Sequence, residues 1–393
     1  MEGISEMGCL LFLYKMNELS IFKPTLVINE AICKNNIKQM AEKARKHHLI
    51  FRPHFKTHFS AEIGEWFRDQ RVYCITVSSV QMAEYFASHG WKDIAIAFPV
   101  NIAEAEKINE LASKIRLSIL VESVQAIDSL DKNLRSETDV YVKIDTGYHR
   151  TGIGSNAINE IQNVVEKIRL SSHLRFKGFL THAGNTYHAK SVAEILEISR
   201  HSIRQMVNLK NVFQKSYPQL IISTGDTPSC SIENNFSGTD EIRPGNFVFY
   251  DFMQYRLHSC SLEQIAIMMA CPVVAKHPER NELVVYGGAV HFSKEFILNE
   301  DSTRNYGQMA DFDGKNWPSS LEDAYLSDLS QEHGIVKCSD AVFQKYKPGD
   351  IVGFPVFRTF SGHPHKVLYI NISFVILGVP KLLTCLGRYE RIV

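Results

Sequence analysis

Between residue 25 and about residue 250, short runs of apolar and β-branched residues alternate with longer stretches in which apolar residues recur every three or four positions. The short runs are mostly apolar throughout, which is typical of parallel strands covered on both faces. The longer stretches have the period of amphipathic helices, and Ile32, Ile37, Met40 and Ala44 form one such stripe. We therefore expect strands at residues 49–52, 72–77, 93–98, 115–121, 140–145, 176–181 and 220–223, and helices at residues 29–48, 61–69, 80–89, 102–113, 123–133, 155–170 and 191–214.

This alternation predicts repeated βα units and a parallel sheet. Right-handed crossovers allow two main arrangements, an open doubly wound sheet or a closed barrel. No GxGxxG follows the first strand and no GxxxxGK[ST] occurs in the chain, so the usual signatures of the open nucleotide-binding sheets are missing. We therefore predict a (β/α)8 TIM-type barrel, with Ser123 and Ser155 as N-caps of two of its helices.

After about residue 260 the pattern changes to short strands separated by turns, with no regular helices. We expect strands there at residues 265–276, 282–286, 334–338 and 350–357. The fold class is thus an α/β barrel followed by a β-rich C-terminal domain. The predicted boundaries are an N-terminal extension at residues 1–23, packing partly on the β-domain, the barrel at 24–260 and the β-rich domain at 261–393.

Composition and charge narrow the choice of partners and compartment. The chain has 43 Lys and Arg against 43 Asp and Glu, so no long-range field attracts nucleic acid or anionic lipid. No apolar run reaches the roughly 20 residues that a membrane span needs, and residues 8–14 are too short and follow acidic residues, unlike a signal peptide. The eight cysteines form no CxxC pair, which favours reduced thiols in a cytoplasmic protein.

Polar, ionisable and glycine-rich segments recur where the predicted barrel strands end. In a parallel barrel the active-site residues lie at the carboxyl ends of the strands, so the positions of these segments test the barrel prediction. The segments are residues 52–58, 145–152, 181–188, 223–229 and 241–246. Their regular placement predicts a site at this end of the barrel.

Lys56 is the sharpest catalytic candidate. It follows directly on a buried strand and is flanked by His54, Thr57 and His58. A lysine held near other cations has a lowered pKa, which suits it to form a Schiff base and to move protons. The competing interpretation is a strand-end lysine whose amine reaches solvent.

Two turns predict a phosphate-binding nest. Residues 224–227 (TGDT) offer hydroxyls and backbone N–H groups, and residues 243–246 (RPGN) offer a second close backbone approach. Each sequence alone is common in ordinary turns. Arg150 and Arg243 are also compatible with surface ion pairs, His182 with a buried core position, and Tyr187 with simple packing.

Taken in order, these segments resemble the pyridoxal 5'-phosphate (PLP) enzymes with an alanine-racemase-type barrel (fold type III), in the D-threonine aldolase and D-serine dehydratase branch. RPHxKTH is highly specific for this branch, whereas DTGxxRxG is shared with the racemases. The matching pieces are RPHFKTH (52–58), KIDTGYHRTGI (143–153), GFLTHAGNTYH (178–188), STGDTPS (223–229), EIRPGNFVFYD (241–251), YGGAVHFSKE (286–295) and LSQEHGIV (329–336).

The resemblance implies a role for each candidate residue. Lys56 matches the lysine that holds PLP covalently, and Arg150 matches the arginine at the cofactor's phenolic oxygen. Arg243 matches the arginine facing the ring nitrogen, with His182 as its neighbour; such an arginine leaves the pyridine unprotonated and narrows the choice of reaction. The remaining matches are to phosphate-binding positions and to a position near the ring: Thr224, Gly225, Gly245, Asn246 and Tyr187.

The chain departs from the family at the metal site. In this branch a Pro-x-His-x-Cys or Pro-x-His-x-Asp segment binds a divalent ion, such as Zn or Mn, that grips the substrate's β-hydroxyl. Residues 349–356 lead up to this motif, but the sequence after Val356 does not continue it. His363 and His365 supply the ligands if the loop is longer; otherwise they belong to a polar turn, or a reading-frame error has changed the sequence beyond Val356.

The resemblance thus implies a PLP-dependent lyase that acts on a small D-β-hydroxy-amino acid, by aldol cleavage or dehydration, and works as a homodimer. One alternative is an amino-acid racemase of the alanine racemase type, which needs a second acid/base such as Tyr286 or Tyr306. The other is a non-catalytic PLP-binding protein, against which the roughly 130 residues after the barrel argue.

Overall fold

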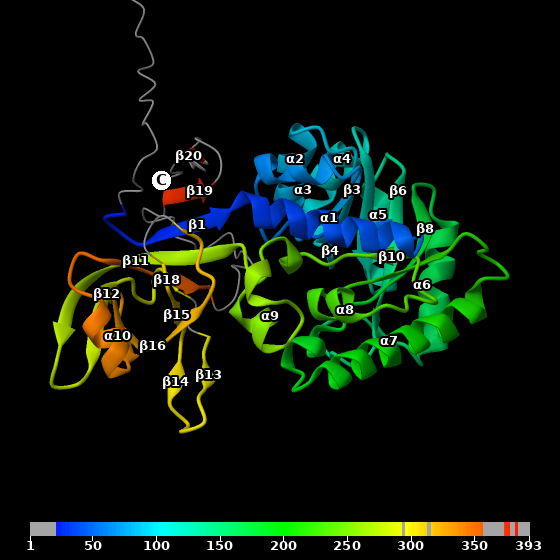
Figure 1. Cartoon of the computed structure of the whole chain (residues 1–393). Coiled ribbons are helices and arrows are strands. Elements are labelled where there is room, and N and C mark those ends of the chain that lie inside the picture. The colour runs from blue at the N-terminus through cyan, green and yellow to red at the C-terminus, as the bar shows by residue number, and fades with distance from the viewer. Residues whose placement is uncertain (1–20, 293–294, 313–315, 357–372, 378–381, 384–393) are drawn as a thin grey trace, which may run out of the picture.

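The computed structural model describes residues 21–292, 295–312, 316–356, 373–377 and 382–383, which form a helix-covered barrel and a β-rich domain beside it (Figure 1). The described part of the barrel has eight parallel strands in the order β2-β10-β9-β8-β6-β5-β4-β3. Their bounds are Ile50–Phe51 (β2), Cys74–Val77 (β3), Asp93–Pro99 (β4), Arg116–Val121 (β5), Thr138–Asp145 (β6), Leu174–Leu180 (β8), Ile221–Thr224 (β9) and Glu241–Ile242 (β10).

The ring of strands closes between the segment after β2 and β3. Phe55 N donates to Thr76 O at 2.8 Å, and Thr76 N donates to Pro53 O at 2.9 Å. The short strand β7 (Ile153–Gly154) pairs only with β6, beside the ring. The predicted barrel is therefore confirmed, and all seven of the expected barrel strands are present.

Helices cover the outside of the barrel, as the 3.6-residue pattern predicts (Figure 1). Ile37, Met40 and Ala44 of the predicted stripe are buried in the main core, and Ile32 packs against it. The α-helices are Glu30–Lys46 (α1), Ala61–Arg68 (α2), Val80–Ser88 (α3), Ala105–Ala112 (α4), Val124–Asn133 (α5), Ile158–Leu170 (α6), Val192–Phe213 (α7), Thr227–Ile232 (α8) and Phe252–Arg256 (α9), with 3-10 turns at Ile102–Glu104, Gly184–His188, Asn246–Val248 and Leu262–Gln264.

The two predicted N-caps have different outcomes. Ser123 caps α5, accepting a hydrogen bond from Ala126 N at 3.2 Å. The prediction for Ser155 is wrong, because α6 begins at Ile158 after Ala157 and the Ser155 hydroxyl donates to Gln205 instead. Pairing of β7 with β6 keeps the chain extended immediately before Ser155, which moves the helix start along the chain.

The second domain is built on an antiparallel barrel of six strands in the order β12-β17-β16-β15-β18-β11, closed by pairing of β11 with β12. The strands are Ile267–His277 (β11), Glu282–Tyr286 (β12), Gln308–Ala310 (β15), Leu321–Leu329 (β16), His333–Cys338 (β17) and Ile351–Pro355 (β18). A hairpin of Ile297–Leu298 (β13) and Arg304–Asn305 (β14) lies beside it. The expectation of no regular helices here is wrong, since Asp340–Lys345 forms α10.

The first described strand joins the second domain although it precedes the barrel in sequence. Thr25–Asn29 (β1) pairs antiparallel with β11 and parallel with Ser373–Leu377 (β19), which in turn pairs with Leu382–Leu383 (β20). Ile21 packs with Val27 and Met268 in the same domain. In the described ranges no helix has both the length and the apolar character that crossing a membrane requires.

Candidate active site

The predicted site residues follow the carboxyl ends of the barrel strands. They are Lys56 after β2, Arg150 after β6, His182 and Tyr187 after β8, Thr224 and Gly225 at the end of β9, and Arg243, Gly245 and Asn246 after β10. Because the strands are parallel, these ends meet at one end of the barrel. The charges of Lys56, Arg150 and Arg243 all act on the pKa of His182, so these side chains do converge.

His182 is held neutral and in one tautomer. Burial, together with the three nearby cations, lowers its pKa to about 3, although the hydrogen bond to Gly225 acts in the opposite direction. Its Nδ1 lies 2.8 Å from Gly225 O. A carbonyl oxygen only accepts, so Nδ1 carries the proton and Nε2 remains an acceptor. His182 therefore ties the end of β8 to the turn after β9.

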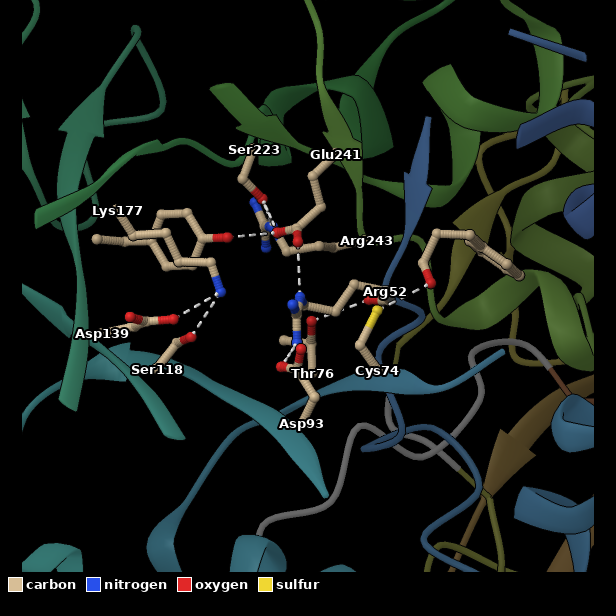
Figure 2. Close-up of polar contacts among 12 residues, drawn as sticks. Arg52, Cys74, Thr76, Asp93, Ser118, Asp139, Lys177, Ser223, Glu241 and Arg243 are labelled. Atoms are coloured by element: carbon tan, nitrogen blue, oxygen red, sulfur yellow. Dashed lines mark hydrogen bonds and ion pairs between the residues drawn. The ribbon is translucent and has the colours of Figure 1, made fainter. Parts of the chain in front are cut away.

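Arg243 is buried, with 4% of its surface exposed, which rules out the surface ion pair. Its Nε donates to Ser223 Oγ at 2.7 Å (Figure 2), and its Nη2 donates to Thr181 O. Burial lowers the pKa of Arg243 from its ordinary value, whereas Glu241 raises it. An arginine keeps its proton at neutral pH even so. Arg243 is thus a fixed positive charge at the carboxyl end of the barrel.

Arg150, by contrast, is exposed, and its guanidinium lies 5.0 Å from the centre of the Tyr148 ring. The loop that carries it is shaped by Asp145. One oxygen of this carboxylate accepts hydrogen bonds from the backbone N–H groups of Gly147, Tyr148 and His149, at 2.9, 3.0 and 3.1 Å. Burial would raise the pKa of Asp145, but these bonds hold it below its ordinary value. The loop is therefore ordered by an ionised carboxylate.

The two turns predicted to form a phosphate nest lie against each other. Gly225 has φ +146°, and a Cβ there would come within 2.5 Å of Arg243 N. A Cβ at Gly245 would come within 2.7 Å of His54 O. Both positions therefore need glycine, because each turn packs its backbone against a neighbouring segment.

Thr227 joins these turns to each other and to Tyr187. Asn246 N donates to Thr227 Oγ1 at 3.0 Å, and Thr227 N donates to Tyr187 Oη at 3.2 Å. Burial raises the pKa of Tyr187, so its hydroxyl stays protonated. Asn246 Oδ1 is buried and has no hydrogen-bond partner among the described residues. Thr227, Tyr187 and Asn246 thus add neutral polar groups to the nest, and the Asn246 acceptor is left unsatisfied in the described part of the chain.

Two more ionisable residues, the half-buried His54 and the buried Lys143, lie at this end of the barrel and were not among the predicted site residues. His54 lies near Lys56 and Arg243, and burial together with these charges lowers its pKa well below the ordinary value. Lys143 is 6% exposed and donates to Ile144 O at 2.9 Å; burial, Arg243 and Arg150 lower its pKa to about 7. His54 belongs to the strand-end segment 52–58 and Lys143 to the matching piece 143–153, and these positions were the available signal.

No metal centre is formed within the described ranges, where no three His, Cys, Asp or Glu side chains are grouped to hold an ion. His363 and His365 lie outside the described residues, so the metal site stays a prediction.

Comparisons with known proteins match the two domains separately. Residues 28–251 match the family profile of the alanine racemase N-terminal domain, and residues 266–356 match that of the D-serine dehydratase domain. The chain is 28% identical to the D-serine dehydratase of Dictyostelium discoideum, over 69% of this chain and 74% of that protein. It is 25% identical to the D-threo-3-hydroxyaspartate dehydratase of a Delftia species, over 82% and 85%.

Solved structures share the whole two-domain architecture. That of the Delftia dehydratase superimposes with a TM-score of 0.79 at 23% identity, covering 86% of this chain and 91% of the other. That of D-threonine aldolase from Filomicrobium marinum gives 0.73 at 18% identity, covering 86% and 87%. At such identities the likeness establishes the fold.

Proposed function

The chain belongs to the family defined by the alanine racemase N-terminal domain, here followed by a D-serine dehydratase domain, and on that premise we propose that it is a PLP-dependent lyase of D-β-hydroxy-amino acids. Its relatives include D-amino-acid dehydratases and aldolases. The observation that carries the proposal is the convergence of Lys56, His182 and Arg243 beside the two glycine turns at one end of the barrel.

The residues present fit PLP. The cofactor carries a phosphate and a phenolic oxygen, and the site supplies two arginines and one lysine. At Gly225 and Gly245 the chain packs so closely against neighbouring backbone that a Cβ would overlap it, which brings the two turns together at the place proposed for the phosphate. Lys56 would hold the aldehyde carbon covalently, and Arg150 and Arg243 would face the phenolic oxygen and the ring nitrogen. When bound, PLP supplies an electron sink for the bonds at the substrate's Cα.

The chain's own residues supply orientation and proton transfer. Arg243 keeps its proton, so it acts as a hydrogen-bond donor and leaves a facing nitrogen without one. His182 stays neutral, which limits the positive charge around the site. The Lys56 amine, when free, would be the base that takes the Cα proton of the substrate.

Loss of water is the reaction we favour over aldol cleavage, because the second domain matches the D-serine dehydratase domain and two of the relatives above are dehydratases. The homodimer and the divalent metal, both implied by resemblance, remain part of the proposal. If the protein is a racemase instead, incubation with one enantiomer of the substrate should yield the opposite enantiomer and no keto acid.

The test uses purified protein loaded with PLP and incubated with D-serine or D-threonine, with and without EDTA. Dehydration of D-serine yields pyruvate and ammonia, whereas aldol cleavage of D-threonine yields glycine and acetaldehyde. We expect Lys56→Ala to lower turnover at least about 10³-fold. Borohydride should fix the cofactor's mass on Lys56. Lys143→Ala is the matched control, a second lysine at the same end of the barrel that should leave this labelling intact. Full activity of Lys56→Ala would refute the proposal.

A further inference from the structure

A carboxylate with no exposed surface lies inside the barrel, one layer below the candidate site. Glu241 accepts hydrogen bonds from Arg52 Nε and Ser223 Oγ, both at 2.6 Å (Figure 2), and from Tyr141 Oη at 3.0 Å. Burial would raise the pKa of Glu241, but the charge of Arg52 and these hydrogen bonds hold it below its ordinary value. Glu241 is therefore ionised and accepts only.

Strand register explains why these side chains meet. Glu241 of β10 is level with Ser223 of β9, and Arg243 lies two residues after Glu241, which puts it on the same face of an extended segment. Ile242 is level with Phe51 of β2, so Arg52 is the next residue along the neighbouring strand. The ionised Glu241 is thus placed beneath two inward-facing arginines.

The hydroxyl of Ser223 connects this carboxylate to Arg243. Ser223 has a single O–H hydrogen, and the ionised Glu241 requires it as a donor. The lone pairs of Ser223 Oγ are then left for Arg243 Nε, at 2.7 Å. With its Nη2 bound to Thr181 O as well, Arg243 is held at two points.

We propose that Ser223 and Glu241 are positioning residues that fix the Arg243 guanidinium against the cofactor. The inference rests on the proposed function, because it concerns the same site. Arg52 pairs directly with two carboxylates, Asp93 and Glu241. Arg243, by contrast, is joined to a carboxylate through the hydroxyl of Ser223, which in turn donates to Glu241. Along this path the negative charge of Glu241 polarises the Ser223 hydroxyl, and that hydroxyl fixes the orientation of the Arg243 guanidinium.

Direct removal of Glu241 is a poor test, because it strips a carboxylate from buried cations and threatens the fold itself. Ser223→Ala is more selective, since it removes the hydroxyl that joins Glu241 to Arg243 and leaves the Arg52–Glu241 pair in place. Tyr141→Phe is the matched control. It also removes one hydroxyl that donates to Glu241 Oε1, but Tyr141 has no hydrogen bond to Arg243 among the described residues.

Both variants are prepared without cofactor and titrated with PLP, following the visible absorbance of the covalently held cofactor and its dependence on pH. Thermal unfolding of the cofactor-free proteins measures the structural cost. We expect Ser223→Ala to raise the PLP dissociation constant about 10-fold, the equivalent of one weakened hydrogen bond to a charged group, and to shift the pH profile of the band. Tyr141→Phe should lower the unfolding temperature about as much as Ser223→Ala does. It should keep the wild-type PLP dissociation constant and the wild-type pH profile.

The outcomes separate this inference from the proposed function. Wild-type protein that binds PLP, with Ser223→Ala and Tyr141→Phe indistinguishable in affinity and pH profile, would overturn the positioning role alone. Wild-type protein that takes up no PLP would overturn the proposed function, and the positioning role with it.

Discussion

Replacing Gly225 with alanine tests whether the turn after β9 holds the site together. Gly225 has φ +146°, and the new Cβ would lie 2.5 Å from Arg243 N and 3.0 Å from Arg243 Cα. Both are backbone atoms that cannot rotate away. The substitution would therefore push β9 from β10 where Arg243 N donates to Thr224 O at 3.0 Å. It would also move the carbonyl that fixes His182.

The expected cost has two parts. Backbone strain from the positive φ costs about 1 kcal/mol or more, and relief of the overlap costs about 1–3 kcal/mol more. Gly349→Ala is the control for the first part, since Gly349 has φ +96° and an added Cβ there meets nothing within 4 Å. Gly225→Ala should therefore unfold about 5 °C below Gly349→Ala, at roughly 2–4 °C for each kcal/mol.

Thermal unfolding of the cofactor-free proteins measures the stability difference, and titration with PLP measures the effect on the site. Only Gly225→Ala should weaken PLP binding, because Gly349 lies in the second domain, between α10 and β18. Equal unfolding temperatures for the two variants would refute the packing argument. Unchanged PLP affinity in Gly225→Ala would show that the turn moves without disturbing Arg243 or His182.

Two further predictions concern charged groups near the site. The pKa of Lys143 is about 7 in the folded protein and 10.5 ordinarily, so burying its charge costs stability below about pH 7, and this cost disappears as the pH rises toward 10.5. Lys143→Met should raise the unfolding temperature more at about pH 6 than at about pH 9, and an equal gain at both would contradict this. The pKa of Asp145 is lowered in the folded protein, so its ionised carboxylate stabilises the fold. This stabilisation is fully present above the ordinary pKa of an aspartate and is lost as the pH falls through the lower pKa of the folded protein. Asp145→Ala should cost about 1 kcal/mol in urea unfolding at neutral pH, Asp145→Asn less, and neither should matter in acid.

The sequence predicted the barrel well because strands covered on both faces are apolar throughout, and helices outside them keep a clear period. It failed where tertiary contacts override local pattern. β16 carries a bulge between Leu326 and Asp328, which breaks the alternation that would have revealed it. The six residues of α10 are too few to show a helical period. The pairing of β1 with β11 joins segments that no local pattern connects.

The order of the strands along the chain was enough to predict which segments form the site, but not how their side chains are buried or hydrogen-bonded. The rule that parallel strand ends meet selected the segments containing Lys56, His182 and Arg243, and the structure brings these three together. Whether a side chain is buried and how it is hydrogen-bonded depends on contacts between segments far apart in the chain. Thus Arg150 and Arg243, equivalent candidates in the sequence, prove to be exposed and buried respectively. His54 and Lys143 were missed for the same reason.

The charged layer beneath Arg243 is hard to explain as a device for stability. Replacing a buried ion pair with apolar residues of similar volume is often neutral or stabilising, because removing charges from water costs about as much as their attraction returns. Barrel interiors of this kind are ordinarily filled with branched apolar side chains. In this barrel Arg52 and Glu241 occupy that space instead, and their hydrogen bonds lead through Ser223 to the guanidinium that faces the site. Selection for stability alone would not keep an arrangement that gives up apolar packing. Selection for a fixed Arg243 guanidinium at the site would keep it.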